Sequence, residues 1–218
     1  MTLIYVKDGK MSMRELAAMI DRIPEMDVFK LKRVSLDGTE DDIIALSKTL
    51  RGHPNLDELR MIDITLTDSS LNLDQVVSLV LVTVTDLKVL ELENVPISTS
   101  TLASVGFCTC LKTVAFPNSN LTDKDASVLA NAVAHSDSIE SIDLSGNDLS
   151  DLGCIAFASA LMKNTSIKSI RLEGNGKISG EQRIHIDTAL LERAEGNARL
   201  KMDRGTRNTD LRYISSTN

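Results

Sequence analysis

Apolar and polar residues along this chain follow first the period of a strand and then that of a helix. From Ile139 to Ser166 the sequence reads IESIDLSGNDLSDLGCIAFASALMKNTS. Its first half alternates as a half-buried strand does, and Asn147 follows at a position that suits a turn. Its second half has the 3.6-residue spacing of an amphipathic helix. The residues that form the apolar side of this predicted helix are Leu152, Ile155, Ala156, Ala160 and Leu161.

The same pattern recurs 28 residues before and 28 residues after this stretch. The earlier unit reads Leu111-x-x-Val114-x-Phe116-x-x-Ser119-x-Leu121, and the later one reads Ile167-x-x-Ile170-x-Leu172-x-x-Asn175. A unit of this size cannot bury its apolar face alone, so neighbouring units must stack on one another. The recurrence therefore predicts one elongated domain with a continuous core.

These units resemble the leucine-rich repeat family, and their 28-residue length with a full helix resembles its ribonuclease-inhibitor-like subclass. The resemblance is closest from Leu111 to Ile178 and extends more weakly from the start of the chain to about Ala194. It implies a curved, right-handed α/β solenoid of about seven units, with a parallel β-sheet on the concave side and helices on the convex side. It also implies that the turn residues Asn147 and Asn175 are structural, with side chains that bond the backbone of the turn.

The N-terminal units depart from the consensus but keep its order. Ser12-x-x-Glu15 is a capping box that predicts a helix over residues 13–23, after a strand with Ile4, Val6 and Met11. Thr39-x-x-Asp42 predicts the next helix in the same way. We expect Leu31, Val34 and Leu36 on the second strand, and Ile43, Ile44, Leu46 and Leu50 on the inward face of its helix. The turn position is assigned to Thr39, Ile64, Val95 and Ser119 in these units.

Domain boundaries follow from where the pattern starts and stops. The solenoid is predicted over residues 1–195, with 1–30 as its N-terminal capping unit. Ser179-x-x-Gln182 opens a C-terminal capping helix over 179–195, with apolar Ile184, Ile186, Leu190 and Leu191. Residues 196–218 are polar and aperiodic, which predicts an extended or disordered tail.

The formal net charge of −7 is unevenly distributed. From Gly196 onward five Lys or Arg residues stand against two Asp residues, so the tail carries +3 and the remaining chain −10. An acidic body argues against nucleic-acid binding, whereas the basic tail suits contact with an acidic surface. The three cysteines show no disulfide-scaffold spacing, and no signal peptide or apolar run of about 18 residues is expected. We therefore predict a cytoplasmic or nuclear protein with no membrane span.

Sequence motifs typical of catalytic, cofactor-binding or metal-binding sites are weak in this chain. The glycine-rich stretch Gly174 to Gly180 lacks the spacing of a phosphate-binding loop, and turn geometry explains its glycines. Cys108 and Cys110 provide two ligands where a structural zinc site needs four. We predict a non-enzymatic protein without catalytic residues, cofactor or metal site.

The side chains between the core positions of each strand point to the concave face. The middle column is predicted to be Tyr5, Ser35, Arg60, Glu91, Ala115, Asp143 and Arg171. Its flanking columns are Lys7, Asp37, Ile62, Glu93, Pro117, Ser145 and Glu173 on one side and Leu3, Arg33, Glu58, Val89, Thr113, Ser141 and Ser169 on the other. The candidate partner-binding residues are Tyr5, Arg33, Arg60, Ile62, Glu91, Glu93, Asp143 and Arg171.

The predicted function is a protein-interaction module or scaffold that binds a partner protein through the concave face. One alternative is a charged face that only keeps the sheet soluble, and another is a structural subunit that docks by its convex helices or its tail. Two further alternatives come from resemblance: a tropomodulin-like protein that binds actin ends, and a small-GTPase regulator similar to the Ran GTPase-activating proteins.

Overall fold

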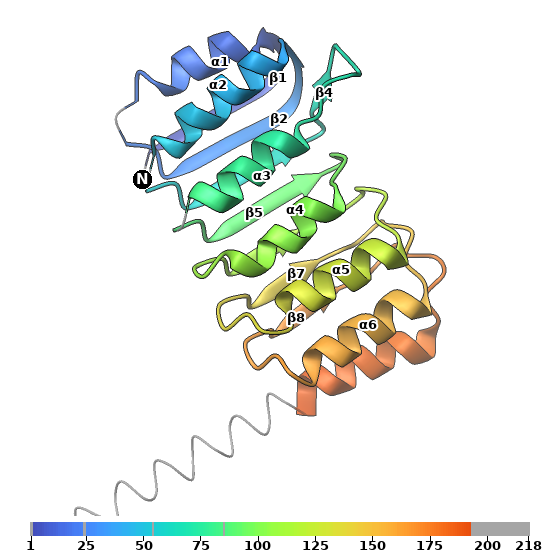
Figure 1. The fold of residues 1–218 in the computed structure, drawn as a ribbon. Coiled ribbons are helices and arrows are strands. Elements are labelled where there is room, and N and C mark those ends of the chain that lie inside the picture. Colours follow the sequence, from blue (N-terminus) through green and yellow to red (C-terminus); the bar gives the residue numbers. More distant parts are fainter. Residues whose placement is uncertain (1, 24, 54, 85, 193–218) are drawn as a thin grey trace, which may run out of the picture.

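A computed structural model describes residues 2–23, 25–53, 55–84 and 86–192 (Figure 1). The predicted tail over 196–218 and the end of the C-terminal capping helix lie outside these residues. Parallel strands alternate with helices along the described chain. Among the described residues there are seven units that begin with a strand, which confirms the predicted leucine-rich repeat architecture.

The strands form one sheet in the order β1-β2-β3-β5-β6-β7-β8, in which each strand pairs in parallel with its neighbour and the short β4 pairs with β2. Their bounds are β1 Leu3–Ser12, β2 Val28–Asp37, β3 Glu58–Ile62, β4 Thr65–Leu66, β5 Val89–Glu93, β6 Thr113–Ala115, β7 Ser141–Asp143 and β8 Ser169–Arg171. The helices are α1 Met13–Ile20, α2 Glu40–Arg51, α3 Asp74–Thr83, α4 Thr99–Ser104, η1 Val105–Phe107, α5 Asp123–Val133 and α6 Asp151–Leu161, followed by helical residues 180–192.

The helices cover one face of the sheet, and no described helix covers the other face, which we call the open face (Figure 1). The core lies between the sheet and the helices and runs through every unit. Phe29, Phe116 and Phe157 are its largest fully buried side chains, and the rest is mainly Leu, Ile and Val. Parallel strands joined by helices require this layered arrangement, because each crossover brings the chain back to the same side.

The capping boxes predicted for the first two helices are confirmed. Ser12 accepts a hydrogen bond from the Glu15 amide and Glu15 accepts one from the Ser12 amide. Thr39 and Asp42 make the same exchange at the start of α2. The first helix, however, ends at Ile20 rather than at Ile23.

The register predicted for the second unit is wrong by five residues. Phe29, not Val34, lies beside Ile4 on β1 and Leu59 on β3. The cause is the length of β2, whose ten residues contain two apolar alternations separated by Arg33, which has a positive φ of 51°. Open-face positions predicted for Arg33, Ser35 and Asp37 therefore belong to Val28, Lys30 and Lys32. The turn position belongs to the buried Val34, while Thr39 caps α2.

Several residues predicted on inward helix faces are exposed, namely Ile44, Leu152, Ile155, Ile184 and Leu191. Each helix lies on the sheet along a narrow stripe, and residues beside that stripe face solvent. In α6 the stripe consists of Gly153, Cys154, Phe157, Ala160 and Leu161. In the helical segment 180–192, Ile186 is buried and Leu190 is partly buried.

Candidate partner-binding face

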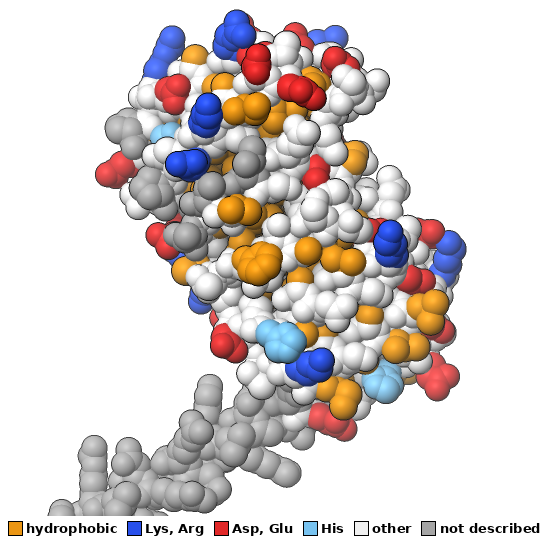
Figure 2. Space-filling model, viewed as in Figure 1, with side chains coloured by type: hydrophobic (Ala, Val, Ile, Leu, Met, Phe, Trp, Pro, Cys, Tyr) orange, Lys and Arg blue, Asp and Glu red, His pale blue; other side chains and the backbone are white. Residues whose placement is uncertain are grey.

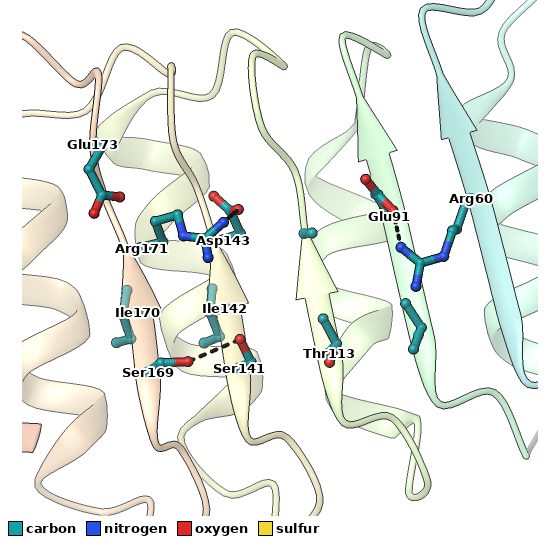
Figure 3. A pocket seen from close by; sticks show the side chains of 12 residues that line it. Arg60, Glu91, Thr113, Ser141, Ile142, Asp143, Ser169, Ile170, Arg171 and Glu173 are labelled. Carbon is teal, nitrogen blue, oxygen red and sulfur yellow. Dashed lines mark hydrogen bonds and ion pairs between the residues drawn. The ribbon is translucent and has the colours of Figure 1, made fainter. Parts of the chain in front are cut away.

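The open face carries one row of side chains that crosses five neighbouring strands. Strand register aligns Arg60 on β3 with Glu91 on β5, then Ala115 on β6, Asp143 on β7 and Arg171 on β8. These positions point away from the core because their neighbours along each strand are buried. Five of the seven residues predicted for the middle column thus lie together, and Figure 3 labels four of them, Arg60, Glu91, Asp143 and Arg171.

Arg60 joins two strands on one side of this row. Its Nε lies 2.9 Å from Glu58 Oε2, and its guanidinium also pairs with Glu91. Burial alone would lower the pKa of Arg60, but the hydrogen bonds to Glu58 and Glu91 raise it above its usual value. The three side chains are half-buried, so water competes less for this cluster than for a fully exposed ion pair.

Arg171 makes the corresponding pair on the other side. Its Nη1 lies 2.9 Å from Asp143 Oδ2. Asp143 Oδ1 accepts hydrogen bonds from the Ser145 amide at 2.9 Å and the Ser145 hydroxyl at 2.7 Å. The carboxylate is therefore fixed from two directions, whereas the Arg171 side chain is largely exposed. In Figure 3 both arginines lean toward the middle of the row.

Small side chains lie between the two ion pairs and leave a groove of about 390 Å³. Thr113 and Ala115 on β6 form its floor. Beside Thr113, Ser141 and Ser169 hydrogen-bond to each other at 3.0 Å (Figure 3). The full lining is Arg60, Val89, Glu91, Thr113, Ala115, Ser141, Ile142, Asp143, Ser169, Ile170, Arg171 and Glu173. We call this feature the sheet groove.

Four of the candidate residues, Tyr5, Arg33, Ile62 and Glu93, are not among the residues that line the sheet groove. Tyr5 is on β1, where Lys30 lies 5.5 Å above its ring, and Arg33 pairs with Asp8. Ile62 was predicted to be available to a partner, but it is buried. It occupies an open-face position between Lys32 and Glu93 on the neighbouring strands, whose longer side chains flank it.

The turn asparagines bond to the backbone of two units at once. Asn147 Oδ1 accepts from the amides of Ser119 and Leu121 at 3.0 and 2.9 Å, and its Nδ2 donates to the carbonyls of Phe116 and Leu144. Asn175 accepts from the Leu149 amide and donates to the carbonyls of Leu144 and Leu172. Both side chains are buried, and each connects its own turn to the preceding unit.

Sequence reasoning missed a row of left-handed residues beside these turns. Each described unit has a positive φ four residues after its first core position (Ile4, Phe29, Leu59, Leu90, Val114, Ile142 or Ile170). These positive-φ residues are Asp8, Arg33, Asp63, Asn94, Asn118, Gly146 and Gly174. Asn, Asp and Gly tolerate this conformation best, so their recurrence was a usable signal. Asn94 donates to Asp63 at 3.0 Å, which connects two members of the row.

Reactive and metal-binding groups are not gathered at the sheet groove. Cys108 and Cys154 are buried, and burial raises the pKa of the Cys108 thiol to about 11. Within the described residues, no group of three or more His, Cys, Asp or Glu side chains is arranged to hold a metal ion. The described helices also include none with the length and apolar character needed to cross a membrane.

Comparison with known proteins identifies the repeat. The family model described as "Leucine Rich repeat" matches residues 135–158, which include β7, its Asn turn and most of α6. The chain contains a leucine-rich repeat. Its place in the ribonuclease-inhibitor-like subclass stays a prediction. The search of curated proteins found no match to this chain. One solved structure similar to it is titled "Leiomodin-1 Actin-Binding Site 2 (ABS2)", with 14% identity, a TM-score of 0.45, and coverage of 74% of this chain and 95% of that chain.

Proposed function

We propose that this leucine-rich repeat protein is a non-enzymatic interaction module that binds a partner protein in the sheet groove. The observation that carries the proposal is the groove itself, a hollow over small side chains between the Arg60–Glu91 and Asp143–Arg171 pairs. Charged walls beside a small-residue floor offer both polar anchoring and room for an inserted side chain.

Preorganisation supports binding rather than catalysis. The wall side chains are already held by ion pairs and by the parallel strands beneath them, so little further ordering is needed when a partner arrives. Two of the three carboxylates that line the groove, Glu91 and Asp143, are paired with arginines, and its hydroxyl groups have no histidine or lysine beside them in the lining to act as a base.

The sharpest test fills the groove while leaving its ion pairs in place. Ala115→Arg places a long side chain over β6, and the flanking Glu91 and Asp143 can accept its guanidinium. Ala18→Arg is the matched control, because Ala18 is exposed on α1, on the opposite side of the sheet. Both full-length variants and the unmodified chain would be tagged and used to capture partners from native lysate, with quantification by mass spectrometry.

The expected result is a loss of at least about tenfold in the captured partner with Ala115→Arg and no loss with Ala18→Arg. Thermal unfolding of all three proteins checks that the fold is kept. Equal capture by Ala115→Arg and the unmodified chain would contradict binding in the sheet groove.

The helix side provides a second candidate surface. Phe107 is 80% exposed at the end of η1 and Met162 is 89% exposed after α6, and Figure 2 shows apolar side chains gathered over the helices. Exposed large apolar side chains are typical of subunit contacts, which suits a structural subunit. A Phe107→Ser/Met162→Ser variant that loses every partner retained by Ala115→Arg would favour this role.

A further inference from the structure

We propose that the basic C-terminal segment, residues 196–218, docks on the acidic half of the open face of the same chain. This inference rests on the proposed function, since it names a competitor for the sheet groove. Three features carry it: the charge division of the open face, the gap at Ala115, and the length of chain that follows the last described residue.

The open face is divided by charge. Its positions on β1 and β2 carry Lys7, Lys30 and Lys32. From β3 to the end of β8 the acidic residues outnumber the basic ones: Glu58, Glu91, Glu93, Asp143 and Glu173 stand against Arg60 and Arg171. A cationic segment is therefore attracted to the C-terminal half of the face and repelled from the N-terminal half.

The gap at Ala115 gives this attraction a definite position. Along the central row the side chains read Arg60, Glu91, Ala115, Asp143, Arg171, so two carboxylates flank one small residue. Adjacent strands are about 4.8 Å apart, which places a cation over Ala115 within reach of both carboxylates. A carboxylate offers about four acceptor positions, so pairing with one arginine leaves positions for a second donor.

The C-terminal segment has the complementary charge. Five basic residues, Arg199, Lys201, Arg204, Arg207 and Arg212, stand against Asp203 and Asp210. The described helix reaches Glu192 in the unit of β8, which is the last strand of the sheet in the described chain. Glu192 lies on the helix side, so the segment must first pass the edge of the sheet, roughly 10 Å as for packed layers, and then cross two strand spacings, about 10 Å, from β8 to β6. The nine residues 193–201 span up to ~30 Å, so Lys201 and the later basic residues can reach the sheet groove.

Docking of this segment would regulate partner access. A cation of the segment that occupies the position over Ala115 excludes a partner side chain from the same place. The contact is electrostatic and exposed to solvent, so raised salt weakens it. Charge reversal in the segment should therefore increase partner capture while leaving the solenoid unchanged.

Zero-length carbodiimide cross-linking of the full-length chain tests the contact, because it joins an amine only to a carboxylate in direct contact. Lys201 is the single lysine of the segment. Equal amounts of isotopically light and heavy protein separate cross-links within one chain from those between chains. We expect Lys201 to couple within the chain to Glu91, Glu93, Asp143 or Glu173, with at least fivefold loss in Ala115→Arg and no loss in Ala18→Arg. Arg199→Glu/Arg204→Glu should reduce the same cross-links and increase partner capture.

Two outcomes would overturn the inference. One is coupling of Lys201 to helix-side carboxylates such as Glu40 and Glu181 as often as to the open face. The other is open-face coupling that Ala115→Arg leaves unchanged. Either result is distinguishable from failure of the proposed function. The cross-linking tests only the contact of the segment, whereas partner capture by Ala115→Arg is measured separately and tests binding in the sheet groove.

Discussion

The side chains of Asn147 and Asn175 pair with backbone groups of the turns that would otherwise have no hydrogen-bond partner. Buried backbone amides and carbonyls are costly when unpaired, and each asparagine bonds to groups in two units. In the corresponding positions of the N-terminal units the apolar side chains of Val34, Ile64 and Val95 are buried instead. Hydrogen bonding at this position therefore couples the C-terminal units more strongly than the N-terminal ones.

Replacement of Asn147 tests this coupling. Asn147→Ala leaves several buried backbone groups unpaired and should lower the free energy of unfolding by about 3 kcal/mol. Asn131→Ala, at an exposed position of α5, is the control and should change it by less than about 0.5 kcal/mol. Urea denaturation of the two variants gives the comparison, and equal stability would exclude a structural role for the Asn147 side chain.

The cysteines should differ in reactivity because the thiolate is the reacting form. Burial raises the pKa of Cys108 to about 11 and also raises that of Cys154, while Cys110 is partly exposed. Brief iodoacetamide treatment at about pH 8 should alkylate Cys110 and leave the other two unmodified until the protein is unfolded. Peptide mass spectrometry measures this, and rapid alkylation of Cys108 in the folded protein would contradict its burial.

At the scale of elements, the first turn of one helix caps the start of the next. Asp123 of α5 accepts from the Ser150 amide at 2.8 Å and the Gly153 amide at 2.9 Å, and Asp151 of α6 accepts from the Ser179 amide at 2.7 Å. Asp74 accepts from Ser98 in the same way. The carboxylates lie near helix N-termini, where negative charge is favourable, so they join consecutive units on the helix side.

This capping makes stability depend on pH. Partial burial of Asp123 works against its charge, but the hydrogen bonds from Ser150 and Gly153 hold its pKa below the usual value of 3.8. Its contribution is therefore complete above about pH 4 and is lost as the pH falls through the lowered pKa. Asp123→Asn should be less stable than the unmodified chain at about pH 7, and the difference should shrink below about pH 3.5.

Denaturation across this pH range provides the measurement, with Asp137→Asn, an exposed residue before β7, as the control. A stability difference between the unmodified chain and Asp123→Asn that stays constant down to about pH 2 would contradict the assigned role of the carboxylate.

The row of positive-φ residues also restricts which side chains fit where neighbouring units meet. A Cβ at Gly146 would lie 2.0 Å from Asn118 Oδ1, and the φ of Gly146 is 69°. Gly146→Ala should therefore destabilise the protein by about 2 kcal/mol or more. Gly176→Ala, where an added Cβ meets nothing within 4 Å, should be close to neutral. Equal urea midpoints for the two variants would show that the close approach is relieved at little cost.

Sequence patterns predicted elements well where they matched one period and poorly where two patterns overlapped. The 28-residue units around Asn147 have the predicted strand and helix, and both N-terminal capping boxes form. The error in β2 arose because a ten-residue strand contains two alternations that satisfy the same template. Too many apolar helix residues were predicted to be buried, because their spacing does not show that the sheet covers only a narrow stripe of each helix.

At the scale of the whole molecule, the stacked units create surfaces that no single unit contains. The sheet groove draws side chains from β3 to β8, which are separated by more than a hundred residues in sequence. Its central row was predictable because strand period and repeat length fix register in the regular units. The open-face positions on β2 could not be predicted from this spacing. The burial of Ile62 could not be predicted either, because it depends on the side chains of the neighbouring strands.

Charge is divided along the open face, with lysines on the N-terminal strands and excess carboxylates on the C-terminal ones. Long-range fields of this kind act on association rate and orientation more than on folding. A partner with a basic contact surface should therefore bind more slowly as ionic strength rises. Surface plasmon resonance of the captured partner at several salt concentrations measures this, and an association rate independent of salt would contradict electrostatic steering.

Carboxyl footprinting of the full-length protein, free and bound to its captured partner, tests the central claim most directly. Glycine ethyl ester labels accessible carboxylates, and mass spectrometry quantifies each one. Binding in the sheet groove predicts reduced labelling of its lining carboxylates Glu91, Asp143 and Glu173, with Glu40 and Glu181 on the helix side unchanged. Reduced labelling at Glu40 or Glu181 with the groove carboxylates unchanged would contradict the account and place the partner on the helices.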